Sequence, residues 1–325
     1  MRYPAAEKLD IIRLVEGSPL PVRHTLTKLG VPRATFYRWY DRYRQGGPDA
    51  LADRVPRAER VWNRIPQAVR DSVIQLALDE PALSPRELAA RFTDTRSYFI
   101  SEASVYRLLK ARDLIASPAF IVIKAAASFK DKTTAPNQLW QTDFTYLKVI
   151  GWGWFYLSSV LDDFSRYIVA WKLCTTMQAE DVTATLDLAL RAAGLDEATS
   201  TGRPRLLSDN GSSYIASHLA EWLEDRKIKH VRGAPYHPMT QGKIERWHQT
   251  LKNHILLENY FLPGDLEAQL AAFVDYYNNH RYHESIDNLT PADVYFGRGP
   301  TILAERERIK RHTIAERRLQ HQLQV

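Results

Sequence analysis

The sequence has 325 residues, of which 45% are hydrophobic and 25% are charged, and its formal net charge is +6. This composition is ordinary for a soluble globular protein, and the length is enough for two or three domains. The absence of any apolar run near the roughly 20 residues of a bilayer span excludes a membrane-spanning helix, and a single cysteine, Cys174, excludes an internal disulfide and a cysteine-rich zinc cluster.

The charge is distributed unevenly along the chain. Residues 1–135 hold 23 Lys and Arg against 15 Asp and Glu, residues 136–296 hold 14 against 20, and residues 297–325 hold 7 against 3. The basic segments favour binding of a polyanion such as DNA. If the acidic middle segment meets the same polyanion, cations must lie between its carboxylates and the polyanion's negative groups. Chance variation between segments is the alternative.

The first predicted domain, residues 1–48, contains three short helices: "AAEKLDIIRLVEGS", "PVRHTLTKLG" and "VPRATFYRWYDRYR". Two helices joined by a tight turn that contains Gly30 form a helix-turn-helix pattern, and Pro32 favours the start of the last helix. The aromatic residues of this helix would face the other helices. Four residues would remain outside, where they could contact phosphates and base edges: Arg33, Thr35, Arg38 and Arg42. An ordinary three-helix bundle with a basic surface is the alternative.

A second helix-turn-helix domain is predicted over residues 65–116, after a linker at 49–64 that is rich in Pro and charge. Its middle helix has the spacing of a capping box, with Ser84 before it and Glu87 three residues later. Its last helix turns three candidate DNA contacts outward: Ser104, Arg107 and Lys110. A spacer or a dimerisation element is the alternative. Residues 117–134 form a second, partly extended linker.

The third predicted domain, residues 135–297, is rich in predicted β-strands, unlike the two helical domains before it. Three β-rich stretches, "LWQTDFTYLKVI", "GWGWFYLSSVLDDFS" and "RYIVAWKLC", predict consecutive antiparallel strands. After them come a helix, a short strand ending in "SDNG", a helix, a strand and a last helix. This order predicts an α/β fold, a ribonuclease-H-like core in which helices flank a mixed five-stranded sheet. Residues 298–325 are predicted to form a basic helical tail.

Three acids stand out by their context within this core. Asp143 lies inside the first strand, where Asp is disfavoured, Asp209 lies at the end of the fourth strand, and Glu245 lies on the last helix. In the predicted order, all three can converge at one edge of the sheet. Clustered carboxylates repel one another unless they are protonated or bind hard cations, and they suit Mg²⁺ or Mn²⁺. Taken singly, each has a structural alternative: an edge-strand polar residue, a turn residue and a helix salt bridge.

The last helix also carries a polar stripe. Glu245, Gln249 and Lys252 follow one another at i, i+4 and i+7, so they share one helical face. Lys252 would lie about 10 Å beyond Glu245 along the helix, at 1.5 Å per residue. That distance suits a cation that holds a phosphate beside the reacting one, and a solvated helix face is the alternative.

These motifs resemble the DDE transposases and retroviral integrases. The resemblance rests on "LWQTDFTYL", "LSDNGSSY" and "HPMTQGKIERWHQTLK" around the three acids, and on "YYNNHRYHESIDNLTPADVYFG" at the end of the core. It covers about residues 135–297. Retroviral integrases begin with a His-His-Cys-Cys zinc module that a chain with one cysteine cannot form, so the resemblance points to bacterial insertion-sequence transposases.

The resemblance implies binding of terminal inverted repeats, metal-dependent cleavage that frees a 3′-hydroxyl, and joining of that hydroxyl to target DNA. Asp143, Asp209 and Glu245 would be both catalytic and metal-binding, with Mg²⁺ (or Mn²⁺ in its place) and two ions per site. Lys243 and Lys252 would contact DNA. The expected partners are transposon-end duplex, target DNA and further copies of the chain, because two ends must be held together.

Two rival functions remain open from the residues alone. One is a domesticated transposase that only binds DNA as a regulator, and the intact acidic triad argues against it. The other is a ribonuclease-H-type nuclease, against which the two helix-turn-helix domains argue. The N-terminal "MRYPAAEKLD" has no apolar signal segment, so we expect a cytoplasmic, nucleoid-associated bacterial protein without a membrane partner.

Overall fold

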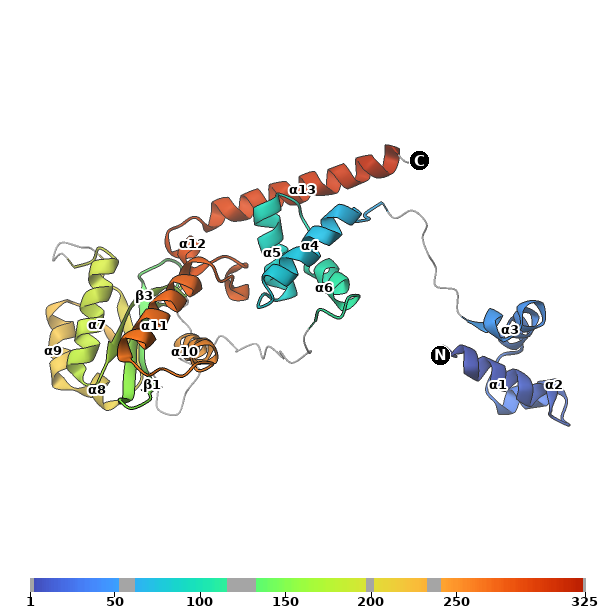
Figure 1. Cartoon of the computed structure of the whole chain (residues 1–325), viewed down its shortest axis with the longest axis horizontal. Coiled ribbons are helices and arrows are strands. Elements are labelled where there is room, and N and C mark those ends of the chain that lie inside the picture. Colours follow the sequence, from blue (N-terminus) through green and yellow to red (C-terminus); the bar gives the residue numbers. More distant parts are fainter. Residues whose placement is uncertain (1–2, 53–61, 116–132, 197–201, 233–240, 324–325) are drawn as a thin grey trace. The chain divides into compact units, whose positions relative to one another are not determined.

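The computed structural model describes residues 3–52, 62–115, 133–196, 202–232 and 241–323 (Figure 1). Most of both predicted linkers therefore lies outside the described residues, as does "GAPYHPMT", which precedes the helix that carries Glu245. That helix is not the last of the core, because further helices follow it before residue 297. The chain divides into two compact units, Met1–Arg64 and Ile65–Val325. Within the described ranges, no helix is long and apolar enough to cross a bilayer.

The first unit is a small helical bundle. Its elements are α1 (Ala5–Glu16), α2 (Val22–Lys28), α3 (Arg33–Gly46) and the short 3-10 helix η1 (Pro48–Leu51). Phe36 and Trp39 of α3 pack with Ile12 and Leu26 in a buried core, as the aromatic spacing predicts. Arg33, Arg38 and Arg42 are exposed and Thr35 is half-buried, so this face of α3 is basic and open to solvent.

The second unit begins with three helices, α4 (Gln67–Asp79), α5 (Pro85–Arg96) and α6 (Glu102–Lys110). The predicted capping box at the start of α5 is present, because Ser84 accepts from the Glu87 backbone and Glu87 accepts from that of Ser84. On α6, Arg107 and Lys110 are exposed. The Ser104 hydroxyl lies 2.9 Å from that of Ser101, within the helix cap, and a DNA contact by Ser104 stays a prediction.

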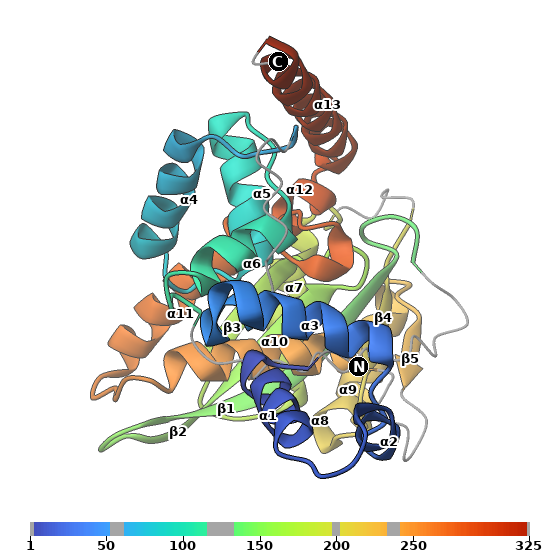
Figure 2. The same ribbon diagram turned by 90° about the vertical axis from the view of Figure 1, so that its right-hand side faces the viewer.

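A long C-terminal helix, α13 (Gly299–Leu323), occupies the predicted basic tail and lies beside α5 (Figure 2). Arg306 holds Asp94 with two hydrogen bonds of 2.7 Å each, and Thr313 accepts from the Phe99 backbone at 3.0 Å. Arg317 adds hydrogen bonds to the Tyr98 hydroxyl and to the Phe99 carbonyl. The basic residues of this helix are therefore partly used to hold the α4–α6 bundle.

The remainder of the unit is built on the predicted mixed sheet. Its strands are β1 (Leu139–Val149), β2 (Gly153–Asp162), β3 (Ile168–Cys174), β4 (Arg205–Ser208) and β5 (His230–Arg232). Their order is β3-β2-β1-β4-β5, with β1, β2 and β3 antiparallel and with β4 and β5 parallel to β1. This is the sheet of a ribonuclease-H-like fold.

Helices cover both faces of this sheet (Figure 1). They are α7 (Ala179–Ala192), α8 (Ser212–Ile215) and α9 (Ser217–Asp225) on one side, and α10 (Gly242–Ile255) and α11 (Pro263–Asn279) on the other. The 3-10 helix η3 (Glu284–Ile286) and α12 (Pro291–Tyr295) follow. The apolar face of α10 packs Ile244, Trp247 and Leu251 onto the sheet, which fixes where its polar stripe lies.

Candidate active site

Asp143 lies in the middle strand of the sheet, opposite Ser159 of β2. Its side chain is 23% exposed, and its Oδ2 lies 3.5 Å from Nδ1 of His248, on the sheet-facing side of α10. Its Oδ1 accepts a hydrogen bond from the Phe144 backbone at 2.8 Å. The acid inside the strand is therefore a partly open carboxylate that faces α10, rather than a buried structural residue.

Asp209 reaches the same region through the parallel pairing of β1 and β4. Leu207 is paired with Gln141 in the last pair of this ladder. Asp143 lies two residues further along β1, and Asp209 directly follows Ser208, the last residue of β4. Asp209 is exposed, and its Oδ1 accepts from the Gly211 backbone at 2.9 Å. A Cβ at position 211 would come within 3.0 Å of that oxygen, so the Asn-Gly turn gives the carboxylate room.

The charges of both acids affect the pKa of the buried Tyr214 side chain. Burial raises the pKa of its hydroxyl well above the usual range, and the negative charges of Asp143 and Asp209 raise it further. Its ring lies 6.1 Å from that of Phe144, next to Asp143 in the strand. The carboxylates of Asp143 and Asp209 therefore both act electrostatically on one buried side chain, which supports their placement at a common edge.

Glu245 lies in the first turn of α10 and is exposed. The start of this helix is held against β1, because the Ile244 backbone donates to Oε1 of Gln141 at 3.2 Å. One turn after Glu245, His248 contacts Asp143. The helix that carries the third acid is therefore fixed beside the strand that carries the first.

The three carboxylates are not gathered into one cluster. In the part of the chain that the structure describes, no three His, Cys, Asp or Glu side chains lie close enough to hold a metal ion. Asp143 and Asp209 each accept a backbone hydrogen bond, and like charges favour separation. The structure brings the three elements together, and the assignment of the acids as ligands stays a prediction. The donors themselves are carboxylate oxygens, which suit a hard divalent cation.

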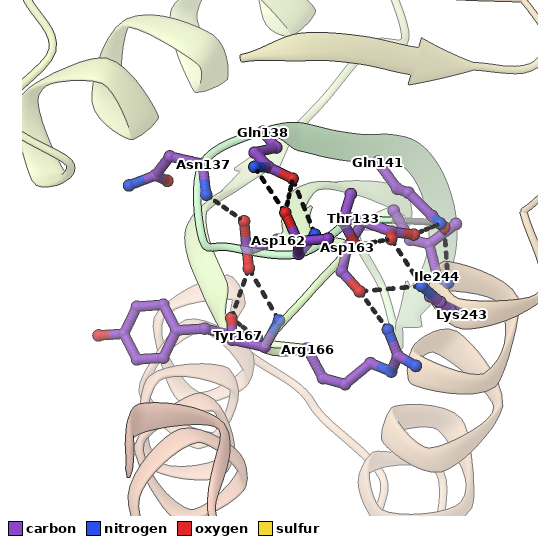
Figure 3. A network of polar contacts seen from close by, with 12 residues as sticks. Thr133, Asn137, Gln138, Gln141, Asp162, Asp163, Arg166, Tyr167, Lys243 and Ile244 are labelled. Atoms are coloured by element: carbon purple, nitrogen blue, oxygen red, sulfur yellow. Dashed lines mark hydrogen bonds and ion pairs between the residues drawn. The ribbon is translucent and has the colours of Figure 1, made fainter. Parts of the chain in front are cut away.

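A buried polar network ties the start of α10 to the turn after β2 (Figure 3). Asp163 accepts from Lys243 Nζ at 2.6 Å, from Gln141 Nε2 at 2.8 Å and from the Thr133 hydroxyl at 2.7 Å. Burial alone would raise its pKa, but the pKa is lowered, because the hydrogen bonds from Lys243 and Thr133 and the positive charges of Lys243 and Arg166 together outweigh burial. The network positions the first turn of α10, where Glu245 lies.

This network was not predicted from the sequence. Asp163 and Lys243 are 80 residues apart, and no local pattern signals their contact. Lys243 also donates to the Asp163 carbonyl at 2.9 Å, so its ammonium has a structural role in the protein. A DNA contact by Lys243 stays a prediction.

The predicted polar stripe of α10 divides into separate local contacts. Gln249 donates to Asn253 at 2.8 Å, further along the helix. Lys252 places its Nζ 4.3 Å from the centre of the Tyr146 ring on β1. Lys252 therefore packs against β1, the strand that carries Asp143, at a residue three positions beyond that acid.

Family models identify the domains of the chain. Two models described as integrase core domain match residues 133–238 and 226–291. A homeodomain-like model matches residues 35–109, and a helix-turn-helix model matches residues 7–59. The chain therefore contains an integrase core domain preceded by helix-turn-helix domains.

Curated relatives of this integrase-like chain include transposases. The transposase of transposon Tn552 from Staphylococcus aureus is 24% identical over 305 residues, and the match covers 86% of this chain and 62% of the relative. The putative transposase InsK of insertion sequence IS150 from Escherichia coli (strain K12) is 25% identical over 276 residues, and the match covers 84% of this chain and 93% of the relative. The Gag-Pro-Pol polyprotein of squirrel monkey retrovirus is 33% identical over 119 residues, 36% of this chain and 6% of the polyprotein.

Solved structures of retroviral integrases are also similar to the core. The magnesium complex of the HTLV-2 integrase catalytic core, in its trimeric form, has a TM-score of 0.40 at 21% identity, covering 50% of this chain and 99% of that one. The simian T-cell lymphotropic virus intasome has a TM-score of 0.45 at 19% identity, and the match covers 64% of this chain and 74% of that chain.

Proposed function

We propose that this chain is a DNA transposase that binds the ends of its element, cleaves them and joins them to target DNA. The observation that supports the proposal is the pairing of β1 with β4, because Asp143 and Asp209 both follow this ladder, beside the helix that carries Glu245. The chain spans 62% of the length of the Tn552 transposase, so the activity is proposed here from the site.

The reaction needs no covalent enzyme intermediate. In the first step a water oxygen bonds to phosphorus and the bond to the 3′-oxygen breaks, which frees a 3′-hydroxyl. In the second step that hydroxyl bonds to a target phosphorus and displaces the target's own 3′-oxygen. Burial raises the pKa of Cys174 to about 12, so the single thiol is not a nucleophile at neutral pH.

The site residues would bind divalent metal and present the DNA. Asp143, Asp209 and Glu245 would hold Mg²⁺ or Mn²⁺, with two ions per site, and the cation would neutralise charge on the reacting phosphate and polarise the attacking oxygen. The Asp163–Lys243 network holds the first turn of α10 in place. Arg33, Arg38 and Arg42 on the open face of α3 would bind end DNA, and copies of the chain on two ends would form the active assembly.

The test is a joining assay with the full chain. A labelled duplex of the element end, taken from the DNA that flanks the gene, is incubated with plasmid and Mg²⁺. We expect slower-migrating joined products that EDTA abolishes. Cleavage without joining would indicate a ribonuclease-H-type nuclease, and specific binding without either product would indicate a DNA-binding regulator; each outcome overturns the proposal.

Lys252→Ala should lower joining of a pre-cleaved end by about tenfold, because one charge-assisted contact to a phosphate is lost. Overall affinity for the end duplex should change little, since the helix-turn-helix domains supply most of the binding. Lys252→Arg should recover part of the joining, because it keeps the charge and changes its geometry. Joining of a pre-cleaved oligonucleotide and its binding are measured side by side.

The matched control is Lys229→Ala, which removes an exposed lysine before β5. Lys243→Ala is a second comparison with a different signature. Its ammonium pairs with the buried carboxylate of Asp163, so its loss should lower the melting temperature as well as activity. Equal, small effects of Lys252→Ala and Lys229→Ala on joining would mean that Lys252 belongs to an ordinary solvated face.

A further inference from the structure

The α4–α6 bundle has a hydrophobic core of its own, and α13 attaches it to the sheet domain (β1 to α12). The described members of that core, which include Leu88, Phe92 and Val105, all come from residues 65–115. Arg306 of α13 donates two hydrogen bonds to the carboxylate of Asp94 on α5, each 2.7 Å long. The Arg306 and Asp94 side chains are only 15% and 25% exposed, so water screens their attraction incompletely. The fork geometry of such a pair fixes orientation as well as distance.

The same guanidinium binds the loop between α11 and α12. Its nitrogens donate to the carbonyl oxygens of Asp287 at 3.1 Å and of Asn288 at 3.0 Å. Both residues have positive φ angles, 58° and 54°, a left-handed conformation that Asp and Asn adopt more readily than most side chains. The Tyr282 hydroxyl, at the start of this loop, donates to Asp94 at 3.0 Å. The clasp consists of these five residues: Asp94, Tyr282, Asp287, Asn288 and Arg306.

Both ends of the loop that carries the clasp are fixed on the sheet. At the end of α11, the Asn278 amide accepts from the Ile168 backbone at 2.9 Å and donates to the Ile168 carbonyl at 3.1 Å, at the start of β3. On α12, the Tyr295 ring stacks on that of Tyr167, with centres 4.5 Å apart, and its hydroxyl donates to Asn137 at 3.0 Å. The clasp therefore connects α5 to the sheet by a route that does not depend on the linker predicted at residues 117–134.

A second attachment lies further along α13. Thr313 accepts from the Phe99 backbone at 3.0 Å, and Arg317 donates to the Tyr98 hydroxyl at 2.9 Å and to the Phe99 carbonyl at 2.8 Å. Thr313 and Arg317 are 1% and 6% exposed. Thr313 follows Arg306 by seven residues, which is about 10 Å along a helix. Two attachments this far apart fix the angle of the bundle on α13, because a single one would leave it free to turn.

The clasp leaves the outward side of α6 open. Arg107 and Lys110, the basic residues predicted to contact DNA on this helix, are exposed and take no part in the clasp. The Arg107 side chain donates to the Ala103 carbonyl within α6, at 2.9 Å. The bundle uses α5 and the residues directly after it for the attachment, so α6 can bind DNA while the clasp stays closed.

We propose that the clasp makes the α4–α6 bundle and the sheet domain one rigid body, and that Asp94 and Arg306 are positioning residues that set which phosphate of a DNA end is cleaved. When α6 is bound to DNA, a rigid connection places the acids at one fixed distance from the bound base pairs. A bundle held by a linker alone would allow several distances. This inference rests on the proposed function and extends it to the choice of the cleaved phosphate.

The first measurement tests rigidity without DNA or metal. Cys174 is buried, so spin labels attach to two introduced cysteines of the full chain, Ser72→Cys on α4 and Glu221→Cys on α9, both at exposed positions. Pulsed electron paramagnetic resonance should give one narrow distribution of distances between the labels. Arg306→Gln should lower the ratio of clasped to open molecules at least about tenfold, because hydrogen bonds between charged groups are lost. The open molecules should appear as a second, broad component.

The matched control is Arg308→Gln, on the same helix. Arg308 is 69% exposed and pairs with Glu305 of α13 itself, so its loss should leave the distribution narrow. Arg306→Lys keeps the charge without the fork and should give an intermediate distribution. Tyr282→Phe removes a single hydroxyl contact of the clasp, and it serves as the milder variant if Arg306→Gln does not fold.

The second measurement reads the position of cleavage. The unlabelled full chain cuts an end-labelled duplex of the element end in Mg²⁺, and denaturing electrophoresis gives the product lengths. The wild type and Arg308→Gln should cut at one phosphate. Arg306→Gln and Asp94→Asn should cut at several neighbouring phosphates. A loss of stability alone would lower the amount of product and leave its length unchanged.

The two measurements separate the clasp from the proposed function. A broad distribution in the wild type, or a narrow one in Arg306→Gln, would overturn the inference. Cleavage at a single phosphate by Arg306→Gln, despite a broadened distribution, would overturn the positioning role. A distribution that is narrow in the wild type and broad in Arg306→Gln, in protein that does not cleave, would support the rigid clasp and remove the proposed function.

Discussion

Asp143→Asn, Asp209→Asn and Glu245→Gln should each abolish cleavage and joining. Each change removes one ligand charge with almost no change in volume, so the fold should persist while the site loses its affinity for divalent metal. The loss should exceed about a hundredfold, because removing even an outer partner of a metal ligand can cost that much. The joining assay with Mg²⁺ measures the effect, and specific binding of end DNA should stay near the wild-type level.

The matched control is Glu224→Gln on α9, which neutralises an exposed acid of the same core outside the site. A second readout does not depend on activity. If the acids hold a cation, Mn²⁺ should raise the melting temperature of the wild type and of Glu224→Gln, because a ligand that binds only the folded state stabilises it. The three site variants should lose most of that rise. Near-normal joining by any one of them would remove that residue from the ligand set.

The strands of the core could be predicted from the sequence because their signals are local. Alternating and β-branched stretches mark β1, β2 and β3, and the "SDNG" turn marks the end of β4, so the mixed sheet and its flanking helices follow from the chain order. The placement of Asp143 relative to Asp209 depends on strand register. Register is set by packing across the sheet, and only the structure gives the pairing of Gln141 with Leu207.

The contacts that could not be predicted are those between residues far apart in the chain. Asp163 lies in the β2–β3 turn, and its pairing with Lys243 appears only when this turn meets the start of α10. Likewise, α13 was predicted as a basic helical tail from its charge and pattern. Its Arg306 instead binds Asp94, 212 residues earlier, a contact that nothing in either local sequence signals. Side-chain partners of this kind depend on tertiary packing rather than on propensity.

Trp247→Ala should cause the largest loss of stability in the catalytic core. Trp247 is 1% exposed and packs between the rings of Phe273 and Tyr277, with centres 5.8 Å and 4.5 Å away. Its indole nitrogen also donates to the Ser159 hydroxyl at 3.3 Å. Replacing a buried Trp by Ala costs about 3–5 kcal/mol, which lowers the melting temperature of a core of this size by roughly 6–20 °C.

The same substitution should also impair joining at temperatures where the protein stays folded. Trp247 lies between Glu245 and His248 on α10, and it is the side chain that fixes this helix on β2 through Ser159. Loss of the anchor would let the first turn shift, and displacement of reacting groups by about 1 Å can cost a hundredfold in rate. Trp247→Phe should lose less stability because it keeps a ring in the cavity. Calorimetry compares the melting temperatures of both variants with that of the control Trp152→Ala. Trp152 is exposed, so its loss should change stability by no more than about 0.5 kcal/mol. Equal melting temperatures for Trp247→Ala and Trp152→Ala would show that α10 is held on the sheet by other contacts.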